Sequence, residues 1–271
     1  MKKLLLGILT LGFVFSCGGN KTETATKTAA PAKLETLTVG ASPVPHAELL
    51  EQVKEDLKKE GIDLKIVIFN DYVQPNMGLK DKSLDANFFQ HVPYMDDFGK
   101  KNGFEMSAVG NIHIEPMAAY SKKIKSLNEL KDGAEVLLPN DPTNLGRALI
   151  MLDKAGFIKL KDNTKLDSTV QDIVQNTKKI KFTTLAADQI APRLGEVDAA
   201  VINANYAIDT GLTTADAILI ESKDSPYANI VTVLKGNEAD PKVAKLVKAL
   251  QSEKIKKFIE EKYKGSVIPA F

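Results

Sequence analysis

Short apolar runs alternate with helical patterns from Leu37 to the end of the chain, and this alternation restricts the possible folds more than any other feature. Leu64–Phe69 is rich in β-branched residues, as buried strands are. Pro142–Ala155 instead begins with proline and repeats its apolar residues at helical spacing. Strands that alternate with helices predict an α/β fold with largely parallel sheets.

The strands fall into about two sets, which predicts two α/β lobes with a ligand cleft between them. In such sheets a ligand binds beyond the carboxyl ends of the strands. The predicted strands are Leu37–Ala41, Leu64–Phe69, Ala86–Phe89, Ser107–Ile114, Pro116–Ser121, Ala134–Leu138, Ile180–Thr184, Ala199–Ile202, Ala217–Glu221 and Asn229–Leu234. The predicted helices are Pro45–Glu60, Tyr72–Leu84, Val92–Lys101, Pro142–Ala155, Ala187–Leu194, Asn203–Thr210 and Pro241–Lys264.

The first residues predict export and a lipid anchor. Residues 1–16 combine a cationic start with a short apolar run, which is typical of a signal peptide. The four residues 14–17, VFSC, resemble the lipobox of bacterial lipoproteins, in which the cysteine is lipidated; an ordinary secretory leader is the alternative. We therefore expect acylation of Cys17, a membrane anchor and an extracytoplasmic location on the periplasmic side or the cell surface. Residues 17–36 carry few large apolar groups and predict a flexible tether.

Composition argues against several classes of function. A net charge of +1 on 271 residues provides no global field that would attract nucleic acid. The histidines at 46, 91 and 113 show no metal-ligand spacing, and the single cysteine lies in the leader. There is no P-loop and no G-x-S-x-G elbow. We expect a monomeric binding protein without enzymatic activity, metal or cofactor.

Arg147 is the first candidate site residue. Of 36 basic residues only Arg147 and Arg193 are arginines, and a chain biased toward lysine favours arginine where a planar fork is needed. Arg147 follows the turn Asn140–Pro142 near a predicted helix start, where free backbone N–H groups favour an anion. This position suits a carboxylate or a phosphate. An arginine in a surface salt bridge is the alternative.

Aromatic and amide side chains also follow predicted strands. Phe89 and His91 point the same way in an extended stretch, and Tyr94 lies one turn into the next helix. Such aromatic groups, with Tyr72 after another strand, can enclose an apolar ligand, although they can equally form ordinary core. Amides at strand ends can bind the charged ends of an amino acid or can cap helices. These amides are Asn203, its neighbour Asn205, and Asn229.

Several motifs together resemble the methionine-binding, NlpA-like lipoproteins of bacterial ABC importers. They are FNDYVQPN (69–76), DANFFQHVPY (85–94), the stretch 109–133, NDPTNLGRAL (140–149), AVINANYA (200–207) and SPYANIVTV (225–233). The resemblance implies a fold of the periplasmic-binding-protein type with two crossover segments, near Met117–Ser121 and Ser225–Ile230. One lobe would comprise 37–117 and 229–271, and the other 118–228.

The resemblance also implies L-methionine as the ligand, with an ABC permease and its ATPase as partners. It assigns the ligand carboxylate to Arg147, held bidentately, and the polar contacts to Asn203 and Asn229. It assigns the thioether enclosure to Tyr72, Phe89, His91 and Tyr94. If the ligand is the partner of Arg147, removing that arginine should change ligand-free stability little. Another small amino acid, a methionine-containing dipeptide, and an adhesion or antigenic lipoprotein are the alternatives.

Overall fold

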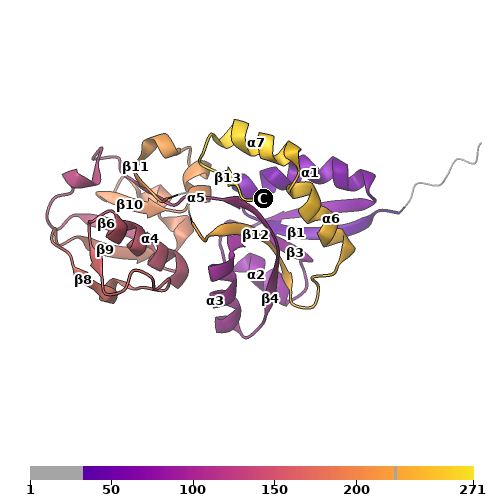
Figure 1. The fold of residues 1–271 in the computed structure, drawn as a ribbon, viewed down its shortest axis with the longest axis horizontal. Helices are drawn as coiled ribbons and strands as arrows, with labels where there is room; N and C mark the ends of the chain where they lie inside the picture. The colour runs from indigo at the N-terminus through magenta and orange to yellow at the C-terminus, as the bar shows by residue number, and fades with distance from the viewer. Residues whose placement is uncertain (1–32, 223–224) are drawn as a thin grey trace, which may run out of the picture. The chain divides into compact units, whose positions relative to one another are not determined.

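The computed structural model describes residues 33–222 and 225–271, and Figure 1 shows their fold. The predicted signal peptide, Cys17 and most of the predicted tether lie outside these residues. Among the described residues no helix is both long and apolar enough to cross a membrane. Residues 33–271 form one compact unit that contains two large β-sheets, each with its own hydrophobic core.

The first sheet has six strands in the order β13-β4-β12-β3-β1-β2. Strand β1 pairs in parallel with β2 and β3, whereas β12 is antiparallel to β3 and β4. The core buries one face of helix α1 with α6 and the strands β1 and β2. The bounds are β1 Glu35–Ala41, α1 Glu48–Lys59, β2 Ile62–Ile68, α2 Gln74–Lys80, β3 Ala86–His91, α3 Val92–Asn102, β4 Met106–Ile114, β12 Ala228–Leu234, α6 Pro241–Leu250, α7 Glu253–Tyr263 and β13 Ile268–Pro269.

The second sheet has five strands in the order β11-β5-β10-β6-β9. Successive residues of its strands enter two different cores: Val136 and Leu138 pack on one face, and Leu137 packs on the other. This period of two is the pattern of a sheet buried on both faces. The bounds are β5 Ala118–Tyr120, β6 Glu135–Pro139, α4 Pro142–Lys154, β9 Lys181–Leu185, β10 Ala199–Ile202, α5 Ala204–Asp209 and β11 Ala217–Ile220, with a small hairpin of β7 Lys159–Leu160 and β8 Ile173–Gln175.

The chain passes between the two sheets twice, between β4 and β5 and between β11 and β12. The two passages lie near the crossover positions that the resemblance implied, and the mixed α/β fold with two sheets is confirmed. Figure 1 shows the two sheets side by side with β4 and β12 leading from one to the other. The exact lobe boundaries remain a prediction.

Several predicted elements differ from the structure. Both sheets are mixed rather than largely parallel, because β12 and β5 each enter a sheet directly from the other lobe and run antiparallel to their neighbours. Residues 187–194 form two 3₁₀ turns instead of a helix, with Pro192 inside the second. The predicted C-terminal helix is two helices, α6 and α7. Strand β1 begins at Glu35, two residues before the predicted start.

Candidate ligand-binding site

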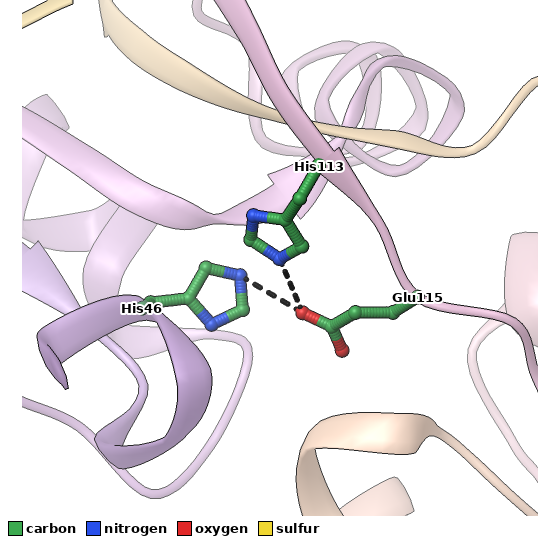
Figure 2. A group of neighbouring side chains, drawn as sticks. All are labelled: His46, His113 and Glu115. Carbon is green, nitrogen blue, oxygen red and sulfur yellow. Dashed lines mark hydrogen bonds and ion pairs between the residues drawn. The ribbon is translucent and has the colours of Figure 1, made fainter. Parts of the chain in front are cut away.

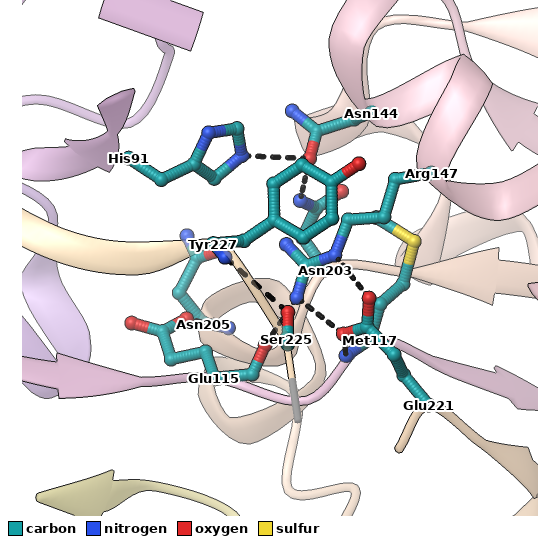
Figure 3. A network of polar contacts seen from close by, with 10 residues as sticks. All are labelled: His91, Glu115, Met117, Asn144, Arg147, Asn203, Asn205, Glu221, Ser225 and Tyr227. Atoms are coloured by element: carbon teal, nitrogen blue, oxygen red, sulfur yellow. Dashed lines mark hydrogen bonds and ion pairs between the residues drawn. The ribbon is translucent and has the colours of Figure 1, made fainter. Parts of the chain in front are cut away.

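A cavity of about 20 Å³ lies where the two lobes and the first crossover meet. All of the site residues predicted from the sequence line it, and so do five others. The lining residues are Tyr72, Phe89, Gln90, His91, Tyr94, Glu115, Asn144, Arg147, Asn203, Ala204, Asn205 and Asn229. Figure 3 shows some of these polar residues together with their neighbours, namely His91, Glu115, Asn144, Arg147, Asn203 and Asn205.

The first lobe contributes an aromatic wall. The ring of Tyr72 lies 5.9 Å from that of Phe89 and 5.8 Å from that of Tyr94. Phe89 and Tyr94 are buried because strand β3 is buried along its whole length and α3 begins directly after it. The hydroxyl of Tyr94 donates to the backbone oxygen of Tyr72 at 2.9 Å. These contacts hold the three rings together as one wall.

His91 connects the aromatic wall to the second lobe. Its Nδ1 accepts from the backbone N–H of Tyr94 at 3.2 Å, so Nε2 carries the proton and donates to Oδ1 of Asn144 at 3.3 Å. The amide of Asn203 donates to the same oxygen at 2.9 Å. Burial and the nearby charge of Arg147 lower the pKa of His91 to about 3. His91 is therefore neutral at physiological pH.

Arg147 is buried and already has a protein partner. Its Nε and Nη2 donate to the two carboxylate oxygens of Glu221 at 2.9 and 2.6 Å, and Nη2 also donates to the backbone oxygen of Glu115 at 2.7 Å. The guanidinium carbon lies 4.4 Å from the centre of the Tyr227 ring. The sequence predicted a ligand carboxylate at this fork; in the structure Glu221 occupies it (Figure 3), and binding of a ligand by Arg147 stays a prediction. Nη1 makes no hydrogen bond within the described residues.

Glu115, in the first crossover, is a site residue that the sequence reasoning missed. Its Oε1 lies 2.7 Å from Nε2 of His113 and 3.3 Å from Nε2 of His46, as Figure 2 shows. Its Oε2 accepts from the backbone N–H of Asn205 at 3.0 Å. Burial raises the pKa of Glu115, and the nearby charge of Arg147 and the hydrogen bond from Asn205 oppose that shift.

The two histidines of this cluster are neutral. Burial lowers the pKa of His46 to about 4 and that of His113 to about 3. With Glu115 they bring three metal-binding side chains within 4.8 Å, which spacing along the chain did not indicate. A histidine that binds a metal usually donates its other ring N–H to a partner. Nδ1 of His113 has none among the described residues, so the cluster fits a hydrogen-bond network better than a metal site.

Asn205 and Asn229 are held by other side chains. Oδ1 of Asn205 accepts from the hydroxyl of Tyr72 at 2.6 Å, which links the two lobes. Oδ1 of Asn229 lies 3.1 Å from Nε2 of His46. In contrast, Oδ1 of Asn203 is buried and has no partner within 33–222 and 225–271. Of the two neighbouring asparagines, Asn203 is therefore the one with a free acceptor.

The model of one protein family, NlpA lipoprotein, matches residues 37–271. The chain belongs to this family. It is 41% identical to the methionine-binding lipoprotein MetQ of Bacillus subtilis, over 99% of each chain. It is 45% identical to the D-methionine-binding lipoprotein MetQ of Escherichia coli K12, over 82% of each chain. A solved nutrient-binding protein from Burkholderia cenocepacia, bound to methionine, aligns with a TM-score of 0.84 and 46% identity, over 87% of this chain and 100% of that one.

For this NlpA lipoprotein, the sequence signal was strongest where a site residue follows a strand or opens a helix. Tyr72 comes after β2 and Asn203 after β10, whereas His91 ends β3 directly before α3, and Arg147 lies in the second turn of α4. Asn144 lies in the same helix opening as Arg147, with its backbone N–H capped by Asp141 at 2.9 Å. Glu115 also follows a strand, so its place after β4 was a usable signal. No local pattern pointed to Glu221 as the partner of Arg147.

Proposed function

We propose that this NlpA lipoprotein binds methionine in the cavity between its lobes and delivers it to the permease of an ABC importer. The observation that carries the proposal is the joint placement of an aromatic wall and a buried arginine around one small cavity. The methionine-bound Burkholderia protein and the names of the relatives support the same ligand. The residues that line the cavity and the similarity to methionine-binding relatives therefore both favour methionine as the ligand.

In this proposal each part of methionine meets a different part of the cavity. The thioether lies against Tyr72, Phe89 and Tyr94, where each sulfur–aromatic contact is worth roughly 0.3–1.5 kcal/mol. The carboxylate accepts from Nη1 of Arg147, the guanidinium nitrogen that Glu221 and Glu115 do not use. His91 completes the enclosure, and Asn203 and Asn229 supply polar contacts. This is a single-nitrogen contact instead of the bidentate one predicted from the sequence.

The lobes already contact each other at the edge of the cavity. Tyr72 donates to Asn205, and the hydroxyl of Tyr206 donates to the backbone oxygen of Asn70 at 3.0 Å. In the proposal a ligand that touches both lobes shifts the population toward this arrangement, which the permease recognises. Acylation of Cys17 would hold the protein at the extracytoplasmic membrane surface beside that permease.

Calorimetric titration of ligand-stripped protein tests the proposal. The arms are L-methionine, D-methionine, a glycyl-methionine dipeptide, leucine and glutamine; the D enantiomer is included because the E. coli relative is named for it. We expect L-methionine to bind at least ~100-fold more tightly than leucine or glutamine, a difference of about 2.7 kcal/mol. Tight binding of leucine or glutamine without methionine would overturn the assignment. Preference for the dipeptide would show that the cavity extends beyond one residue.

A further inference from the structure

We propose that Glu115 binds the α-ammonium group of the ligand, so that the cavity selects α-amino acids whose ammonium group is free. This inference rests on the proposed binding of methionine in the cavity and deepens it. It adds to the site a residue that neither the sequence motifs nor the comparisons assign.

The first argument is that Glu115 is a buried carboxylate without a cation. It is 6% exposed and lines the cavity. The groups around its oxygens are the backbone N–H of Asn205 and the rings of His46 and His113, which are neutral. Within the described part of the chain no lysine or arginine side chain forms an ion pair with it. A buried carboxylate is costly unless a positive charge compensates it.

The second argument comes from the charge of the whole cavity. Arg147 is the cation that lines it, and Glu221 already neutralises that cation through two hydrogen bonds. Glu115 is therefore the acidic side chain of the cavity wall that has no lysine or arginine partner within the described residues. A ligand that brings a positive charge complements it, whereas a purely anionic ligand would add repulsion.

The third argument is a second free acceptor. Oδ1 of Asn203 is buried, belongs to the cavity wall, and has no partner in the described residues. An ammonium group has three N–H donors, so it can satisfy this oxygen and the Glu115 carboxylate together. A hydroxyl group in its place has one donor and no charge. Figure 3 shows Glu115 and Asn203 in the same network.

The fourth argument is the spacing of the two charged subsites. The ammonium and carboxylate of an α-amino acid share one carbon, so the groups that bind them must be neighbours. Arg147 and Glu115 are neighbours, because Nη2 of Arg147 donates to the backbone oxygen of Glu115 at 2.7 Å. The Glu115 carboxylate is held in place by hydrogen bonds from both lobes, through His113 and Asn205. The site is thus preorganised for a zwitterion.

The test compares two ligands that differ at one group. The probes are L-methionine and its 2-hydroxy analogue, 2-hydroxy-4-(methylthio)butanoate, titrated calorimetrically into ligand-stripped wild type, Glu115→Gln and Glu115→Asp. Wild type should prefer methionine by roughly 10²-fold or more, since a site built to bind an N–H group rejects an analogue without it. Glu115→Gln should lose most of that preference by weakening methionine alone. Glu115→Asp keeps the charge and should keep most of the preference.

The outcomes separate this inference from the proposed function. If wild type binds both probes equally well, or if Glu115→Gln weakens both by the same factor, Glu115 does not bind the ammonium and the inference is wrong. If wild type binds neither probe, the proposed function itself fails. If Glu115→Gln does not fold, the ratio of the affinities for the two probes, measured in wild type and in Glu115→Asp, still tests the inference. Glu196→Gln, at an exposed acid, is the matched control and should leave both affinities unchanged.

Discussion

The two arginines of this chain lie in opposite environments, although each pairs with a glutamate. In the region between the lobes, Arg147 is 4% exposed and binds Glu221, which is 14% exposed, through two nitrogens. On the surface of the second lobe, Arg193 is 51% exposed and makes a single contact of 3.0 Å with Glu196, one helical turn away. The residue types are the same, so the difference between the two regions is one of burial and geometry.

The difference in burial decides how much each ion pair contributes to the stability of the folded protein. An exposed pair gains little, because water screens the charges and two flexible side chains must be ordered. A buried pair has already lost its hydration, so removing one partner leaves the other charge uncompensated. Arg147 of the interior pair also lines the cavity, and its Nη1 is the nitrogen that we propose for the ligand carboxylate. In that proposal the buried pair is part of the binding site.

Arg147→Ala should have the largest effect. We expect ligand-free protein to lose about 3 kcal/mol of unfolding free energy, the lower end of the range for a broken buried pair, since Glu221 is only partly exposed and is left without its cation. Methionine affinity should fall by roughly two to four orders of magnitude. Urea denaturation measures the first quantity and calorimetry the second. Unchanged ligand-free stability would mean that the Arg147–Glu221 pair contributes nothing and that the two regions do not differ.

Arg147→Lys should have an intermediate effect. Lysine keeps the charge but cannot offer two nitrogens to Glu221 and a third to the ligand. We expect a loss of about 1.5–3 kcal/mol in stability, the worth of one charge-assisted hydrogen bond. Denaturation of this variant beside Arg147→Ala separates the contribution of the fork from that of the charge. Equal losses in the two variants would show that the fork geometry carries the whole effect.

His91, beside Arg147, should make stability depend on pH. Its pKa is lowered to about 3 in the folded protein by burial and by Arg147, against about 6.5 when unfolded. The unfolded state therefore binds the extra proton, and stability falls as the pH is lowered from about 6.5 toward 3. Between pH 6 and 4, His91→Gln should reduce the slope of unfolding free energy against pH by about 1.4 kcal/mol per unit. Identical slopes would show that His91 titrates normally.

The comparison also shows which parts of the site a sequence can reveal. Arg147 was identifiable because a strand, a turn and a helix start precede it along the chain. Glu221 was not, because it lies 74 residues away and reaches Arg147 only when β11 and α4 come together. His46 and His113 meet Glu115 for the same reason: an irregular turn at Pro43–Ala47 faces the end of β4.

The direction of the strands was a second feature that the sequence did not reveal. Apolar periodicity predicted the strands of both sheets except β13, because burial leaves the same pattern in a parallel and an antiparallel strand. It could not show that β12 returns from the second lobe and runs antiparallel between β3 and β4. That return places Asn229 opposite His91 and His113, and it brings Asn229 and His91 to one cavity wall.

Arg193→Ala should have the smallest effect and completes the comparison. Arg193 lies in a short 3₁₀ turn, exposed to solvent, and does not line the cavity. Its contact with Glu196 spans three residues of the same chain segment, and exposed pairs of this kind contribute only about 0.3–0.5 kcal/mol. Ligand-free stability should therefore change by no more than about 0.5 kcal/mol. Methionine affinity should stay within about twofold of wild type, a change of about 0.4 kcal/mol. Both quantities are measured beside Arg147→Ala under the same buffer and salt. A loss of affinity comparable to that of Arg147→Ala would show that burial does not distinguish the two arginines.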